Sequence, residues 1–270
     1  MSERRFLDAL LDARKHCGGY ALFGDMSGYG GGSDNLPLLQ QHALQSGLKL
    51  YMKIGGCESL RDIRDAKILG ADGIAAQMVE SEYALEKFTE AVESVYGDED
   101  IDLILIINTY NAAGRLDAML ACSAAEKIRI VVANRSDIAM SSGRYMGCDA
   151  AEMTELMAVM NSLCRKKGKK FAVGGDVSEQ SVTVLPDIDA GAQLAVCAGI
   201  VLFECGDAVA DKEKMRNLLY AGILCESEWL QLEWALAEKI RDTAEKQYEL
   251  FMLKYAKTAE RARMKSGGYA

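Results

Sequence analysis

The stretch KIGGCESLRDIRDAKILGADGIAAQMVES, Lys53–Ser81, contains one copy of the pattern that decides the fold. Lys53 ends a short apolar run, and Glu80 follows the next apolar run along the chain. The segment between them carries apolar residues at helical spacing and reaches a natural stop at Gly70. The stretch therefore predicts a strand end, a connecting helix and a second strand.

Similar apolar runs alternate with helical segments along most of the chain. Each run is apolar and largely without pattern, as in strands that are buried on both faces of a parallel sheet. Repeated strand–helix units of this kind predict a (β/α)8 TIM-barrel-like fold, with seven readable strands and an eighth that is less defined. The runs begin at Tyr20, Leu48, Gly73, Ile101, Ile128, Lys170 and Ala192, and the last ends at Glu204.

A doubly wound open sheet is the alternative, and it would need a glycine-rich turn after the first strand. The segment GDMSGYGGGSDN at 24–35 follows that strand, but it does not hold G-x-G-x-x-G in register. Lys53, rather than an acidic residue, ends the next strand, which argues against dinucleotide binding. The cluster also suits a loop over the mouth of a barrel.

The carboxyl third has a different character, so we divide the chain into a barrel core at 1–210 and a helical extension at 211–270. The extension is either part of the same domain or an oligomer interface. Residues from Ser227 to about Met264 contain no proline or glycine, which predicts one long helix or two helices with an unmarked break. We expect a homo-oligomer, a trimer or hexamer, because the helix carries a long apolar stripe. The stripe consists of Trp229, Leu232, Leu236, Ile240, Ala244, Tyr248, Phe251 and Tyr255.

Composition excludes several classes of protein. The formal net charge of −9 over 270 residues makes a nucleic-acid surface unfavourable. No apolar run reaches the roughly 20 residues of a membrane span, and the amino terminus has no signal-peptide core. The eight cysteines form no CxxC pair, which is typical of reduced thiols in a cytoplasmic protein.

Polar residues follow every readable strand, and in barrels the chemistry gathers at the carboxyl ends of the strands. Two cations among several carboxylates suit a small carboxylate substrate and a hard divalent metal. The alternative is that individual members cap helices or form structural ion pairs, such as Lys53 with Glu80 or Asp25. The strand-end residues are Asp25, Lys53, Glu80, Asn108, Arg135, Asp137, Asp176 and Glu204. No histidine is among them, so a Ser-His-Asp or Cys-His relay and a histidine-rich zinc centre are not expected.

The motifs KIGGCES, AAQMVES and NRSD resemble the HpcH/HpaI aldolase and citrate lyase β-subunit family, as do VGGDVSEQS and the run LFE that ends at Glu204. This resemblance implies a PEP/pyruvate-binding TIM barrel that cleaves or forms C–C bonds next to an oxo acid, commonly with magnesium. It implies metal ligands at Asn108 and Asp137, and a basic substrate contact at Lys53. From this resemblance together with the strand-end pattern, we predict a substrate site made of Asp25, Asn108, Gly174, Gly175 and Glu204.

The sequence also departs from the family pattern. Asn108 stands where the family usually has a metal-binding glutamate, and Ala133 replaces the glycine of G-R-x-D. An asparagine carbonyl contributes no charge, so the affinity for Mg²⁺ should fall.

We therefore expect a lyase or aldolase-like enzyme for a small α-oxo acid such as pyruvate, oxaloacetate or phosphoenolpyruvate. We expect the reaction to pass through a metal-stabilised enolate, with a divalent ion on Asp137 and Asn108 or Glu80 assisting. Lys53, Arg135 and Glu80 are the predicted catalytic residues, with Lys53 and Arg135 neutralising the carboxylate and the developing enolate. Two alternatives stay open. One is a metal-independent enzyme in which Lys53 forms a Schiff base. The other is a barrel that has lost lyase activity and serves as a binding or assembly subunit.

Overall fold

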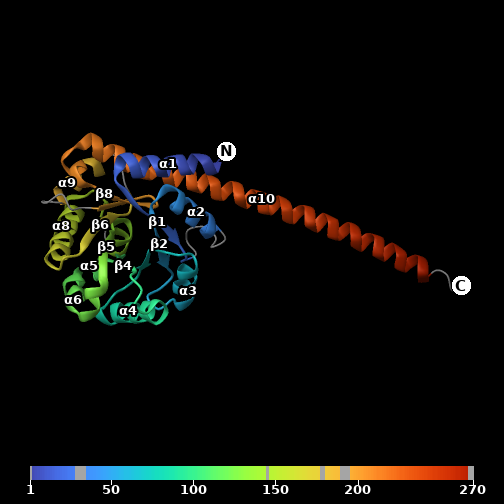
Figure 1. The fold of residues 1–270 in the computed structure, drawn as a ribbon, viewed down its shortest axis with the longest axis horizontal. Coiled ribbons are helices and arrows are strands. Elements are labelled where there is room, and N and C mark those ends of the chain that lie inside the picture. The colour runs from blue at the N-terminus through green and yellow to red at the C-terminus, as the bar shows by residue number, and fades with distance from the viewer. Residues whose placement is uncertain (1, 28–34, 144–145, 177–179, 189–194, 267–270) are drawn as a thin grey trace. The chain divides into compact units, whose positions relative to one another are not determined.

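The computed structural model describes residues 2–27, 35–143, 146–176, 180–188 and 195–266. Among these residues, eight strands pair in sequence order and close into a barrel (Figure 1). The predicted barrel is therefore confirmed. The strands are β1 (Gly19–Asp25), β2 (Lys49–Ile54), β3 (Gly73–Ala76), β4 (Asp102–Ile107), β5 (Ile128–Asn134), β6 (Lys170–Gly174), β7 (Ala195–Ala198) and β8 (Val201–Glu204).

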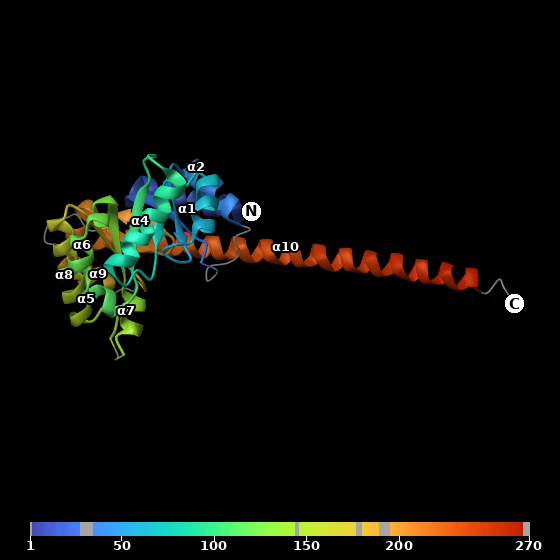
Figure 2. The same cartoon turned by 90° about the horizontal axis from the view of Figure 1, so that it is seen from below.

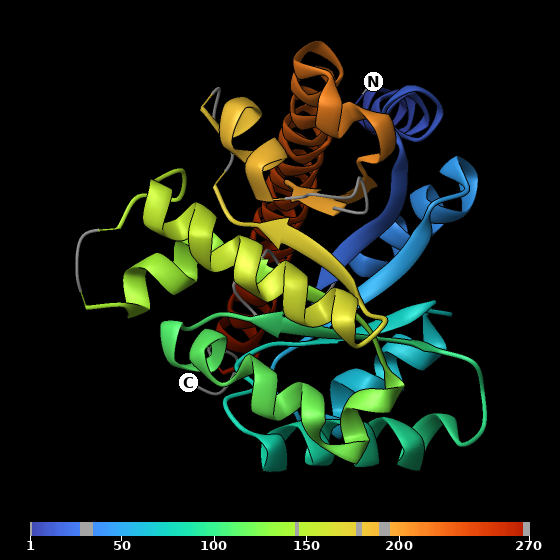
Figure 3. The same cartoon turned by 90° about the vertical axis from the view of Figure 1, so that its left-hand side faces the viewer.

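Helices surround the strands, as Figure 3 shows for the barrel. Within the described ranges, no helix combines the length and the apolar character needed to cross a membrane. The helices are α1 (Ser2–Cys17), α2 (Leu36–Ser46), α3 (Leu60–Ile68), α4 (Glu82–Tyr96), α5 (Tyr110–Gly114), α6 (Leu116–Ala121), α7 (Arg135–Ser141), α8 (Ala151–Lys166), α9 (Ser181–Ile188) and α10 (Lys212–Ser266), with 3-10 turns η2 (Ser123–Lys127) and η3 (Gly206–Ala210).

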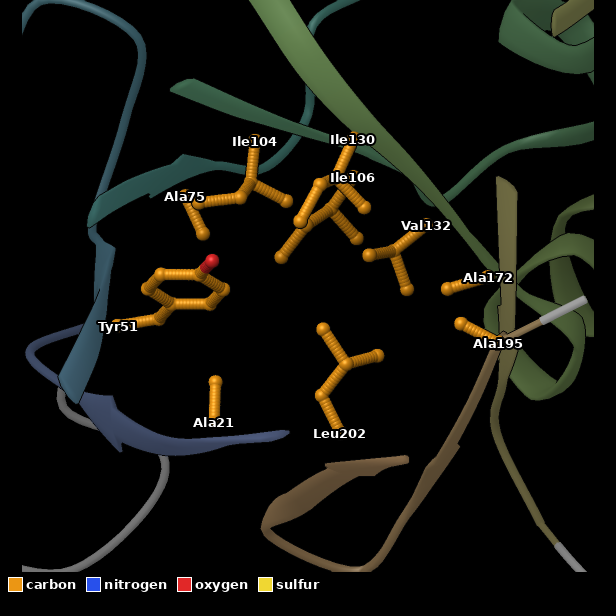
Figure 4. Packing of buried hydrophobic residues seen from close by; sticks show 10 residues of the cluster. All are labelled: Ala21, Tyr51, Ala75, Ile104, Ile106, Ile130, Val132, Ala172, Ala195 and Leu202. Atoms are coloured by element: carbon orange, nitrogen blue, oxygen red, sulfur yellow. The ribbon is translucent and has the colours of Figure 1, made fainter. Parts of the chain in front are cut away.

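The barrel interior is a packed core built from alternate residues of each strand (Figure 4). Large side chains from some strands meet alanines from others, which lets the layers fill the barrel without voids. Every second residue of a strand points to the same face, so these positions also fix which residues face inward further along each strand. The interior residues are Ala21, Tyr51, Ala75, Ile104, Ile106, Ile130, Val132, Ala172, Ala195 and Leu202.

The last two strands form a hairpin, which corrects the prediction of one run from Ala192 to Glu204. β7 ends at Ala198, and Gly199 turns the chain with a φ of +57°, a conformation that glycine adopts readily. β8 then returns antiparallel to β7 and pairs antiparallel with β1. Residues 192–194 lie outside the described residues. The barrel therefore has seven parallel strands, and its eighth runs in the opposite direction.

A charged network lies at the amino-terminal end of the barrel, around the buried carboxylate of Asp102 at the start of β4. Lys49 Nζ lies 2.7 Å from Asp102 Oδ2, and the Tyr51 hydroxyl donates to the same oxygen at 2.6 Å. Arg129 Nη1 lies 2.5 Å from Asp102 Oδ1 and also pairs with the exposed Asp100. Residues from β2, β4 and β5 are joined here, so this end of the barrel has a stabilising role.

The predicted long carboxyl-terminal helix is confirmed as the single helix α10, which runs unbroken to Ser266 (Figure 2). Asp211 caps the amino terminus of α10, because its carboxylate accepts hydrogen bonds from the backbone N–H groups of Glu213 and Lys214. A Cβ at Gly222 would lie 2.6 Å from the carbonyl oxygen of Ala198, so a glycine is needed where the helix crosses the end of β7. Met1–Glu228 forms one compact unit and Trp229–Ala270 a second, so the first turns of α10 belong to the barrel.

Candidate functional site

The carboxyl ends of the parallel strands form one rim of the barrel, and alternation decides which side chains enter it. Lys53 lies two residues beyond the interior Tyr51, and Asn108 lies two beyond the interior Ile106. The other strands extend their inward faces in the same way. The inward rim positions on β1, β2, β4, β5, β6 and β7 are Asp25, Lys53, Asn108, Asn134, Gly174 and Cys197.

Lys53 and Asp25 form an ion pair at this rim. Their backbones are register partners between β1 and β2, and Lys53 Nζ lies 2.5 Å from Asp25 Oδ2. Asp25 Oδ1 also accepts from the backbone N–H and the hydroxyl of Ser27, at 2.8 and 2.5 Å. Both side chains keep some exposure, 29% for Lys53 and 21% for Asp25, so a small solute can reach the pair.

Asp137 is held by two asparagine amides, and we call Asn108, Asn134 and Asp137 the amide clamp. Asn108 Nδ2 and Asn134 Nδ2 each donate to Asp137 Oδ2 at 2.7 Å. Asn108 Oδ1 accepts from the backbone N–H of Met78 at 3.1 Å, and Asn134 Oδ1 accepts from the Ser136 hydroxyl at 2.8 Å. The clamp joins the carboxyl ends of the neighbouring strands β4 and β5.

The magnesium site expected on Asp137 and Asn108 does not fit these donors. Magnesium binds oxygen lone pairs, yet Asn108 turns its N–H group toward Asp137 and commits its oxygen to Met78. Among the residues that the structure describes, no three His, Cys, Asp or Glu side chains come together as a potential metal site. No step of the chemistry is therefore assigned to a metal.

Glu80 lies at the same end of the barrel but is engaged with the start of α5. The Thr109 hydroxyl approaches both carboxylate oxygens of Glu80, at 2.8 and 2.9 Å, and Asn111 Nδ2 lies 3.3 Å from one of them. Thr109 is also the N-cap of α5, since its hydroxyl oxygen accepts from the Ala112 N–H. These contacts give Glu80 a role in positioning the loop after β4.

The Arg135 guanidinium is not available to a substrate at the rim. This corrects the prediction that it neutralises the substrate carboxylate and the developing enolate. Its side chain is 1% exposed, and its guanidinium forms an ion pair at 2.7 Å with Asp149. The remaining donors reach the backbone oxygens of Gly174 at 3.2 Å, Asp176 at 2.6 Å and Cys148 at 3.3 Å. Arg135 therefore joins the end of β5 to the segment after β6.

The predicted substrate contacts at Gly174 and Gly175 also have a packing explanation. Gly175 has a φ of +87°, and a Cβ there would lie 2.7 and 2.8 Å from the backbone nitrogens of Ser136 and Arg135. The space beside this glycine is thus filled by the start of α7. Gly174 faces the barrel interior, where a Cβ would touch Cys197 at 3.4 Å.

Glu204 lies at the opposite end of the barrel, which corrects its placement in the substrate site. Because β8 runs antiparallel, its last residue pairs with Ala195, the first residue of β7. The Glu204 carboxylate forms an ion pair with Lys170, the first residue of β6. The polar residue after this strand therefore contributes to the amino-terminal end rather than to the rim.

Two inward residues at the rim were not predicted from the sequence, Asn134 and Cys197. The period-two pattern through Ile130 and Val132 would have placed Asn134 inward. Cys197 follows from Ala195 in the same way, once β7 is recognised as a separate strand. Burial, partly offset by the nearby Lys53 ammonium, raises the pKa of the Cys197 thiol to about 12, so it stays protonated at neutral pH.

Comparisons with known proteins agree with this architecture. No protein-family model and no curated protein matches the chain, but solved structures do. An HpcH/HpaI aldolase/citrate lyase family protein from Burkholderia cenocepacia superposes with a TM-score of 0.56 at 12% identity, over 79% of this chain and 89% of that one. The chain has the fold of the HpcH/HpaI aldolases.

Two further structures support this assignment. The HpcH/HpaI aldolase from Desulfitobacterium hafniense matches with a TM-score of 0.50 at 12% identity, over 64% of this chain and 74% of that one. The citrate synthase SbnG matches with a TM-score of 0.51 at 15% identity, over 82% and 97%. In this chain, Lys53, Asp25 and the amide clamp lie at the carboxyl ends of the strands. Barrel enzymes hold their active sites at that end.

Proposed function

We propose that this chain is a carbon–carbon lyase or aldolase-like enzyme that acts on a small α-oxo acid of the pyruvate, oxaloacetate or phosphoenolpyruvate type. The observation that carries the proposal is the inward ammonium of Lys53 at the carboxyl rim, paired with Asp25 and still accessible. A cation in this position suits the carboxylate and carbonyl oxygens of an oxo acid. The shared fold with HpcH/HpaI aldolases supports the same class of reaction.

The proposed mechanism begins with an exchange of partners at Lys53. The substrate carboxylate takes the place of Asp25 beside the ammonium, which frees the Asp25 carboxylate to act as the base. Asp25 accepts the proton of the substrate hydroxyl, and the C–C bond breaks as that oxygen becomes the carbonyl of a departing aldehyde or ketone. The electron pair of the broken bond forms the enolate of the oxo acid. Lys53 stabilises the enolate oxygen, and Asp25 returns the proton to carbon. Glu80 holds the start of α5 next to this site.

The amide clamp favours a second candidate, a barrel that binds an oxo acid without cleaving it and serves as a binding or assembly subunit. Its basis is that two amide N–H groups occupy Asp137 Oδ2, so this oxygen is not free to contact a substrate. Exchange of the pyruvate methyl protons with deuterated water, followed by NMR, separates the candidates. Catalysed exchange supports the enzyme, whereas binding without exchange supports the subunit. A covalent adduct with Lys53 after borohydride treatment would instead support Schiff-base chemistry.

Replacement of Lys53 by methionine tests the location of the site. The variant keeps most of the side-chain stem but loses the charge, so we expect pyruvate affinity to fall tenfold or more, ~1.4 kcal/mol, in calorimetric titration. The control is Glu204→Gln, which changes a carboxylate at the opposite end and should leave the affinity unchanged. A lower melting temperature, with binding that follows the folded fraction, would show that Lys53 is only a structural partner. A stable Lys53→Met protein with full affinity would move the site away from β2.

We also propose that the enzyme is a homo-oligomer and that α10 provides part of the interface. The sequence at 229–249 carries five acidic and three basic side chains, whereas 250–266 carries one acidic and five basic. Two copies of this segment would match their charges best if they paired antiparallel, with the apolar stripe between them. Because such pairing joins chains two by two, it requires an even number of copies and therefore favours a hexamer over a trimer.

Sedimentation of the full chain and of a chain that ends at Ser227 tests the assembly. We expect the full chain to sediment as an oligomer and the shortened chain as a smaller species, because a long apolar stripe in this part of the sequence would be costly to leave in water. The single substitution Leu236→Lys, at a partly exposed residue of the stripe, should weaken the oligomer without unfolding the barrel. An equally stable oligomer in both variants would exclude α10 from the interface.

A further inference from the structure

The amide clamp has an orientation that its hydrogen bonds determine. Each asparagine has one amide oxygen and one amide nitrogen, and exchanging the two would break contacts on both sides. The oxygen of Asn108 faces the Met78 N–H, and that of Asn134 faces the Ser136 hydroxyl and, at 3.4 Å, the Asp137 N–H. Both nitrogens must therefore face the Asp137 carboxylate.

Met78 contributes to this orientation through an unusual backbone conformation. Its φ of +58° lies in the left-handed region, and it is the sole non-glycine residue with a positive φ in the described ranges. In this conformation its N–H reaches Asn108 Oδ1. Strain of this kind persists where the surrounding structure requires it. The left-handed turn at Met78 thus holds the buried Asn108 side chain with its N–H group toward Asp137.

A divalent cation at Asp137 would meet the positive ends of these two amide dipoles. Both nitrogens donate to the same oxygen at 2.7 Å, so a cation could bind that oxygen only after displacing them. Another carboxylate at this end of the barrel, Glu80, is engaged with Thr109 and Asn111. The surroundings therefore supply hydrogen-bond donors where a metal needs acceptors.

We infer that the amides of Asn108 and Asn134 take the place of a divalent cation beside Asp137, so that this centre is metal-independent. The inference does not rest on the proposed reaction, because it concerns what the carboxylate binds. Asn108 is the residue that excludes the metal. A carboxylate at its position would remove one N–H donor and add a negative charge beside Asp137, which creates an oxygen-rich pair for a hard cation.

Titration with Mn²⁺, followed by electron paramagnetic resonance of the free ion, tests this directly in the full-length protein. We expect the wild type to show no Asp137-dependent binding up to about 1 mM Mn²⁺, a concentration at which weak protein sites fill. We expect Asn108→Glu to bind Mn²⁺ at least tenfold more tightly than the wild type. The matched control, Asn108→Gln, has the same size without the charge and should resemble the wild type.

Two outcomes would overturn the inference. One is wild-type Mn²⁺ binding below 1 mM that disappears in Asp137→Asn. The other is a folded Asn108→Glu protein that binds no more tightly than Asn108→Gln. If Asn108→Glu does not fold by circular dichroism, Asn134→Asp replaces it, with the wild type as its control and the same expected gain. Pyruvate binding is measured separately, so loss of the proposed function would leave the metal result interpretable.

Discussion

Replacement of Arg135 by methionine is expected to lower the free energy of unfolding by about 3–5 kcal/mol, the cost of removing one partner of a buried ion pair. Arg135 is 1% exposed and Asp149 is 11% exposed, so water cannot take the place of the guanidinium. Three backbone oxygens, those of Cys148, Gly174 and Asp176, would lose a donor as well. Urea unfolding, followed by circular dichroism, measures the change.

The control for Arg135 is Arg115→Met. Arg115 pairs with Glu82 at 2.6 Å, but both are much more exposed, and surface pairs of this kind contribute about 0–1 kcal/mol. The contrast between the two variants isolates burial as the cause. Should Arg135→Met unfold at the same urea concentration as the wild type while losing pyruvate affinity, Arg135 would be a substrate contact and the structural role assigned to it would be wrong.

Replacement of Asp102 by asparagine is expected to lower the free energy of unfolding by about 2–3 kcal/mol, somewhat less than the loss of one partner from a fully buried ion pair. Asp102 itself is buried and accepts from Lys49, Tyr51 and Arg129. Lys49 and Arg129 are 38% and 49% exposed, so both cations can turn to water and recover part of the loss. Asp100→Asn, which removes the exposed partner of the same Arg129, should change stability by less than about 1 kcal/mol.

The same carboxylate predicts a pH dependence. Burial raises the pKa of Asp102, but the hydrogen bonds from Lys49, Tyr51 and Arg129 together lower it below its ordinary value of 3.8. A lowered folded-state pKa contributes stability above pH 3.8 that is lost as the pH falls through the folded-state value. The difference in the free energy of unfolding between wild type and Asp102→Asn should therefore be largest at pH 6 and should decrease below pH 3.8. A difference that stays constant to pH 2 would contradict this assignment.

The sequence predicted the barrel and the positions of Asp25 and Lys53 at its rim, because both depend on local patterns. Apolar runs joined by helical segments define the parallel strands, and the strand ends at Asp25 and Lys53 follow directly from the runs. Their inward direction follows from alternation. Lys53–Asp25 pairing was one of the alternatives open from the sequence, and adjacent strand ends in register make it possible.

Arg135 and Glu204 could not be placed from the sequence, since each depends on contacts distant along the chain. Whether a cation at a strand end is free or buried is decided by Cys148, Asp149 and the segment after β6. The position of Glu204 depends on the reversal at Gly199, which interrupts an otherwise continuous apolar run. A single glycine in such a run marks a strand break only weakly.

The hairpin of β7 and β8 has a consequence for the order in which the protein folds. Its two strands are joined by a two-residue turn, so their pairing closes a very short loop and costs little chain entropy. The remaining seam joins β8 to β1, at opposite ends of the barrel sequence, and its closure carries the largest loss of chain entropy. The first strand therefore keeps one unpaired edge during synthesis until β8 has been made, and an unpaired edge of this kind is a template for pairing with another chain.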